Sequence, residues 1–133
     1  MKRKTSLTLG AVLILVLLVA VATYWYHFNL TLKEAQATDM LIQARGDLQR
    51  GRQADALEKA RAAAKLHSTA LVLLAAGDIA RDANELTLAR DLLGSALVES
   101  RSSDIKLQET IKRSLDAVAV ASSAGSKTSS IAK

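Results

Sequence analysis

The chain carries an uncharged apolar stretch at residues 9–28, LGAVLILVLLVAVATYWYHF, which follows the basic start Met1-Lys2-Arg3-Lys4 after a short polar segment. About 20 helical residues, rising about 1.5 Å each, span the hydrocarbon core of a bilayer. The stretch therefore predicts a single transmembrane helix at residues 9–28, preceded by a basic N-terminus at residues 1–8. It makes the lipid bilayer the first expected partner of this protein.

The two flanks of the stretch predict its orientation. Lys2, Arg3 and Lys4 favour the cytoplasmic side, because basic flanks stay inside. The other flank holds every aromatic residue of the chain, and these predict an interfacial belt: Tyr24, Trp25, Tyr26 and Phe28. We expect a signal anchor of the bacterial inner-membrane type, with a cytoplasmic N-terminus and a C-terminal domain in the periplasm.

The alternative for this stretch is a cleaved signal peptide. Ala20-Val21-Ala22 fits an A-x-A cleavage site after an apolar core, and cleavage would release a soluble periplasmic protein. The apolar character continues past Ala22 into the aromatic belt, which favours the retained anchor. The chain contains no cysteine, so it offers neither a lipid-modified cysteine nor a disulfide.

The charge distribution separates the ends of the chain from its middle. The whole chain has 18 Lys and Arg against 13 Asp and Glu, whereas residues 34–104 have 9 and 11. Nucleic-acid binding needs a basic face on the folded part. The distribution thus disfavours nucleic acid as a partner and leaves one small domain at residues 31–120.

The composition and apolar periodicity of that domain predict an all-α fold. Thr31 and Glu34 fit a capping box, and the alternative is one helix that continues out of the membrane. Further helices are predicted to about Arg50, over 53–67, from Ala70 to the turn at Ala83-Asn84, over 85–100, and after Ser102-Ser103-Asp104. Ser68 and Thr69 are expected to cap the third of these. Leu107, Ile111, Leu115 and Val118 form one apolar stripe, and the Ser-rich residues 121–133 are predicted to be a disordered tail.

An internal repeat appears when the chain is shifted by 33 residues. Gly51 then falls on Asn84, and small or apolar residues superpose in pairs: Ala44 on Gly77, Ala56 on Ala89, Ala60 on Leu93, and Ala63 on Ala96. The first copy departs from the second at Gln43 and Asp47, where the second has Ala76 and Ala80. The pattern describes a helix pair closed by a turn, repeated once.

Over residues 37–103 this pattern resembles the tetratricopeptide repeat (TPR), a helix-turn-helix unit. The resemblance implies about two helix pairs followed by a capping helix. It also implies that the first helix of each pair lines a groove for a partner peptide or helix, which by position would include Leu41, Arg45, Leu48, Leu71, Leu74, Asp78 and Arg81. An unrelated array of alanine- and leucine-rich helical hairpins is the alternative.

The residue pattern contains no catalytic or metal-binding constellation. Its two histidines, His27 and His67, lack paired ligands at helical spacing, so we expect no enzyme activity, metal or cofactor. The sequence instead predicts a membrane-anchored adaptor or accessory subunit that binds protein partners in a membrane complex or in a homo-oligomer. A structural tether of the spanin or coiled-coil type is the alternative, although the turn residues Gly51 and Asn84 disfavour a sustained heptad seam.

Overall fold

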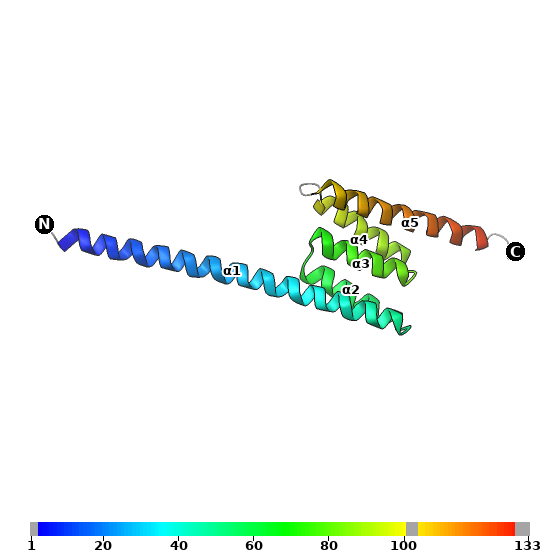
Figure 1. Cartoon of the computed structure of the whole chain (residues 1–133), viewed down its shortest axis with the longest axis horizontal. Helices are drawn as coiled ribbons and strands as arrows, with labels where there is room; N and C mark the ends of the chain where they lie inside the picture. Colours follow the sequence, from blue (N-terminus) through cyan, green and yellow to red (C-terminus); the bar gives the residue numbers. More distant parts are fainter. Residues whose placement is uncertain (1–2, 101–103, 130–133) are drawn as a thin grey trace. The chain divides into compact units, whose positions relative to one another are not determined.

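The computed structural model describes residues 3–100 and 104–129, and the side chains of residues 12–100 and 104–125. The described residues form helices and no strand: α1 (Arg3–Gln49), α2 (Gln53–Leu66), α3 (Ala70–Asp82), α4 (Leu86–Glu99) and α5 (Ile105–Ser129) (Figure 1). The chain divides into two compact units, residues 1–33 and 34–133. The side chains of Lys2, Arg3 and Lys4, together with residues 101–103 and 130–133, lie outside the described part.

The first unit contains the apolar part of α1. Helix α1 is long and apolar enough over Val12–Gln49 to cross a membrane, a finding that rests on length and composition. Its large apolar side chains from Val12 to Val21 and the four belt aromatics are all exposed. Thr23 and Asn29 return hydrogen bonds to the carbonyls of Val19 and Trp25, at 2.7 and 3.1 Å. These two polar side chains therefore have partners within the helix itself, as a bilayer requires.

The capping box expected at Thr31 is wrong. Residues 29–34 are helical without interruption, and the Thr31 hydroxyl donates to the Phe28 carbonyl at 2.9 Å instead of accepting an N–H bond. Thr38 makes the same kind of bond to Glu34. A threonine hydroxyl within a helix finds a carbonyl one turn back, which leaves the helix free to continue. The alternative from the sequence, one continuous helix, is what the structure has.

The second unit is an array of helices packed through small residues. The α1 residues Ala37, Leu41 and Ala44 share one buried cluster with the inner face of α2, made of Ala56, Ala60, Ala63 and Ala64. Helix α3 contributes to this cluster with Val72, Leu73, Ala76 and Ile79, and it also packs on α4 and α5. The apolar first two turns of α3 explain this position, because a helix that is apolar nearly all round is buried on several sides.

The two hairpin turns of the array have the same geometry. Gly51 and Asn84 are the two described residues with a left-handed backbone in these turns, with φ of +76° and +63°. The N–H groups of Arg52 and Glu85 bond the carbonyls of Asp47 and Ala80 at 2.9 Å, and those of Gly51 and Asn84 bond Leu48 and Arg81. These 6→1 and 5→2 bonds define the Schellman ending of a helix. The 33-residue repeat is therefore real at its turns.

Burial follows the same repeat. Each of the four superposed pairs of small or apolar residues is buried in both copies: Ala44 and Gly77, Ala56 and Ala89, Ala60 and Leu93, and Ala63 and Ala96. Gly77 lies at a close crossing, because a Cβ built there would stand 2.7 Å from Cγ of Leu93. The first copy has Ala44 and Ala60 where the second has Gly77 and Leu93. The larger residue on α4 thus matches the absence of a side chain on α3.

Helix α5 closes the far side of the array. Asp104 caps it by accepting the Lys106 N–H at 2.9 Å. Ile111 and Val118 are buried, with Leu107 and Leu115 half-buried, so the predicted stripe is confirmed. Thr69, in contrast, occupies the cap position of α3 without a side-chain cap bond.

The predicted start of a disordered tail at residue 121 does not match the structure, because α5 runs to Ser129. Ser122 and Ser123 return their hydroxyls to the Ala119 and Val120 carbonyls, and alanines favour the helix. Residues 130–133 of the predicted tail lie outside the described residues.

Candidate functional site

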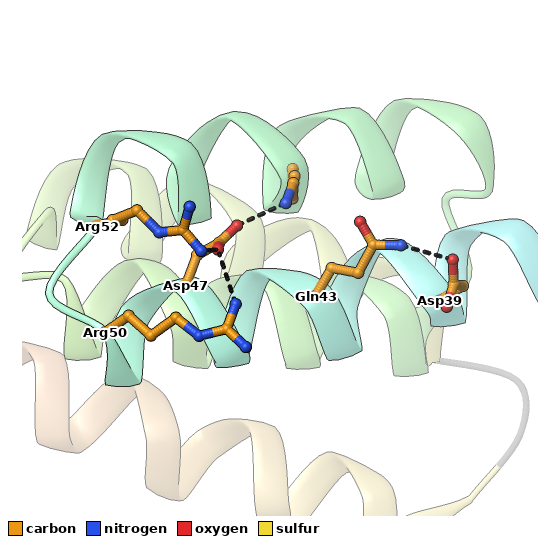
Figure 2. Close-up of polar contacts among 6 residues, drawn as sticks. Asp39, Gln43, Asp47, Arg50 and Arg52 are labelled. Carbon is orange, nitrogen blue, oxygen red and sulfur yellow. Dashed lines mark hydrogen bonds and ion pairs between the residues drawn. The ribbon is translucent and has the colours of Figure 1, made fainter.

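A buried carboxylate marks the end of the α1–α2 hairpin. The Asp47 side chain is 4% exposed and faces three cations. Lys59 Nζ from α2 lies 2.5 Å from one carboxylate oxygen, and Arg52 from the turn lies 2.6 Å from the other. Arg50 stands further off, at 3.9 Å, and stays 71% exposed. Figure 2 shows Asp47 between α1, the turn and α2; we call Asp47, Arg52 and Lys59 the Asp47 cluster.

The turn geometry places this cluster. In a Schellman ending, the residue after the left-handed position approaches the residue that supplies the 6→1 carbonyl, and an apolar contact commonly forms between them. Here those residues are Arg52 and Asp47, so an ion pair replaces the apolar contact. In the second copy the equivalents of Asp47 and Lys59 are Ala80 and Leu92, which belong to one apolar cluster. The same backbone thus holds a charged cluster in one copy and an apolar one in the other.

The cations keep Asp47 ionised. The hydrogen bond from Lys59 lowers the pKa of the Asp47 carboxyl below its ordinary value; burial opposes this effect, and the charges of Arg52, Lys59 and Arg50 add to it. A carboxyl whose pKa is lowered is less suited to act as a general base near neutral pH. The arrangement fits a structural clamp between α1 and α2.

A groove of about 720 Å³ lies beside the cluster. Its wall includes apolar Met40, Ile42 and Ala62 together with exposed charges of both signs on Arg50, Asp55 and Glu58. Gly46 opens the α1 wall, because nothing lies within 4 Å of a Cβ built there. We call this surface the α1–α2 groove. It combines an exposed isoleucine with charged neighbours of both signs.

The residues predicted to line a partner groove are distributed unevenly. Leu41 lies in the core, and Leu48 and Leu74 are half-buried against it. Asp78 and Arg81 are brought together in an ion pair of 3.2 Å, and Arg81 also pairs with Asp82 at 2.9 Å. Arg45 and Leu71 are exposed on α1 and α3. The three leucines thus serve packing to different degrees, Arg45 and Leu71 are exposed, and Asp78 and Arg81 are partly exposed and paired with each other.

Sequence reasoning missed the Asp47 cluster. Asp47 stood out only as a mismatch with Ala80 in the repeat. A signal was present: the position of Ala80 predicts burial, and a buried aspartate needs a cation. Lys59 at the position of Leu92 is the residue that the repeat brings to the same place.

Comparison of the chain with protein-family models, with curated proteins and with solved structures found no match. The tetratricopeptide resemblance stays a prediction.

Proposed function

We propose that this chain is a membrane-anchored adaptor or accessory subunit that binds other proteins and carries out no catalysis. Residues 9–28 hold it in a bacterial inner membrane, with the helical array on the periplasmic side. The observation that carries the proposal is the α1–α2 groove, which presents Met40 and Ile42 among exposed charges. The surface that includes Arg45, Asp78 and Arg81 is the second contact region of the proposal.

The size of the array supports a binding role. About 90 residues bury a core that is marginal by itself, and a short stack of alanine-rich helix pairs has two end faces, of which α5 covers one. Docking on a membrane complex or on a second copy would cover such an end. The tether alternative gains no support from the hairpin turns at Gly51 and Asn84, which reverse the chain direction twice.

Co-purification from detergent-solubilised membranes tests the proposal with three matched double variants of the tagged full chain. Ile42→Ala/Arg50→Ala removes groove contacts, Arg45→Ala/Arg81→Ala removes the second region, and Arg61→Ala/Lys65→Ala changes exposed charges on α2. We expect one of the first two pairs to lose the partner, since truncation at an interface hot spot costs about 2 kcal/mol, or about 30-fold in affinity.

The third variant, Arg61→Ala/Lys65→Ala, should retain the partner. If Arg61→Ala/Lys65→Ala loses the partner while the other two pairs keep it, both binding assignments are wrong. If no protein co-purifies and the chain is monomeric in the membrane, the adaptor role itself is contradicted.

A further inference from the structure

Three large apolar side chains are exposed at one end of the helical array. Leu71, Val98 and Ile105 are 65%, 61% and 77% exposed. Leu71 lies in the first turn of α3, Val98 in the last turn of α4, and Ile105 is the first residue of α5. Successive helices of the array run in opposite directions, so these three positions share one end (Figure 1). We call them the apolar end residues.

The chain enters the array at this same end. Unit 34–133 begins with Glu34 on α1, which then runs away from that end to the turn at Gly51. Helix α2 returns to it and α3 starts from it. The other exposed large apolar residues among the described residues of the array are Ile42 on α1 and Val120 on α5, each away from the first or last turn of its helix. The end by which the chain enters is therefore where exposed apolar residues gather.

The connection to the apolar stretch is short. Six residue steps separate Phe28, the last belt aromatic, from Glu34. Six residues span at most about 20 Å even when fully extended. If residues 9–28 lie in a bilayer, Glu34, where the chain enters the array, thus lies within about 20 Å of Phe28 at the edge of that bilayer.

We propose that the apolar end residues Leu71, Val98 and Ile105 insert into the lipid interface and seat the array on the bilayer. The proposal rests on the membrane anchoring in the proposed function. Exposed Lys65 and Lys106 lie at this end beside exposed Glu99 and Asp104, so the charges carry both signs. The contact is accordingly apolar, and it does not depend on anionic lipid. Seating leaves the far end and the α1–α2 groove open to a protein partner.

The absence of cysteine makes the test direct. Single cysteines at Leu71, Val98 and Ile105 of the full chain are labelled with a polarity-sensitive fluorophore and reconstituted into vesicles that contain nitroxide-labelled lipids. Matched controls lie on the same helices at the opposite end, at exposed Asp82 on α3 and Thr87 on α4. A cysteine at Leu15 reports the anchor itself. Circular dichroism checks that each labelled chain has kept its helices.

We expect strong lipid quenching at Leu15, clear quenching at the three apolar end residues, and none at positions 82 and 87. With the label at position 98, the double variant Leu71→Glu/Ile105→Glu removes the other two apolar end residues. The quenching at position 98 should then fall. The pattern should be the same in zwitterionic and anionic vesicles.

Quenching at Leu15 without quenching at the apolar end residues overturns this proposal and leaves the anchor standing. No quenching at Leu15 overturns both. Blue-shifted emission at the three sites without lipid quenching means that they contact protein, either a second copy or a partner, and this also overturns the lipid contact.

Discussion

Asp47 and Gly77 are single residues that each determine how one helix pair packs. Asp47 joins α1 to α2 through Lys59 and Arg52, whereas its equivalent in the second copy is the apolar Ala80. Gly77 makes room for Leu93, whereas Ala44 and Ala60 share that space in the first copy. The two copies thus use different side chains on one backbone plan, and exchanging those side chains tests the account residue by residue.

Gly77→Leu should destabilise the array. Its Cβ alone would lie 2.7 Å from Cγ of Leu93 and 3.5 Å from the Ala89 carbonyl oxygen, so a leucine must push α3 and α4 apart. Overpacking of this kind costs about 1–3 kcal/mol. Gly94→Leu is the matched control on α4, because nothing lies within 4 Å of a Cβ there. Urea unfolding of the full chain in detergent measures both, and equal midpoints for the two variants would rule out the close crossing.

Asp47→Ala and Lys59→Leu should each destabilise the array, while the double variant should be more stable than either one. Asp47→Ala leaves Lys59 and Arg52 without their carboxylate, and Lys59→Leu leaves the buried Asp47 with Arg52 as its one close cation. The double change gives the first copy the residues that the second has at Ala80 and Leu92. Removing both members of a buried pair is better tolerated than removing one. A double-mutant cycle from unfolding midpoints measures the coupling. Strictly additive effects would show that Asp47 and Lys59 act independently.

The Asp47 pair should also respond to pH. The folded-state pKa of Asp47 is lowered, so its contribution to the free energy of unfolding is present above the unfolded value of about 3.9. It is lost as the pH falls through the folded-state pKa. The stability difference between wild type and Asp47→Asn should therefore be full at pH 7 and shrink below about pH 4. A difference that stays constant from pH 7 to pH 3 would contradict the pKa assignment.

At the scale of the helix, the two hairpin turns and the apolar stripe of α5 were predictable from the sequence. The helix boundaries near Thr31 and residue 121 were not. Gly51 and Asn84 identified both turns, because a left-handed residue ends a helix and the 33-residue shift superposes the two positions. Thr31 misled, since a threonine can either cap a helix or bond a carbonyl within one. The serines after residue 121 misled in the same way. At such positions a hydroxyl side chain is compatible with a helix end and with a helix interior. Whether the helix continues depends on the residues before and after it.

Gly51→Ala should cost about 1–2 kcal/mol, because φ is +76° at that position and an L side chain resists the left-handed region. Asn84→Gly should be nearly neutral or mildly stabilising, since glycine relieves the same strain at φ +63°. Gly46→Ala is the control, with open space in a helix interior and an expected gain of about 0.5–1 kcal/mol. Urea midpoints rank the three variants. A stabilising Gly51→Ala would mean that the turn is not left-handed.

At the scale of the whole molecule, the sequence predicts a transmembrane segment at 9–28 and a helical domain at 31–120. The structure divides into two compact units, residues 1–33 and 34–133. The all-α fold was predictable because the periodicity and composition agree along most of the chain. The candidate site was harder to predict. The leucines proposed for a partner groove pack to differing degrees on the core. The α1–α2 groove is lined by the Asp47 cluster, and the one sequence signal for that cluster was the match of Asp47 to Ala80 in the repeat. Burial of a charged residue depends on partners distant in sequence, which local patterns do not report.

The central claim is that residues 9–28 remain in the chain and hold it in a membrane. Intact-mass measurement of the chain in both the soluble fraction and the carbonate-resistant membrane fraction tests this most directly. The account predicts a species that retains residues 9–28 and has the mass of the uncleaved chain. A soluble species that begins at Thr23, after Ala20-Val21-Ala22, would contradict it.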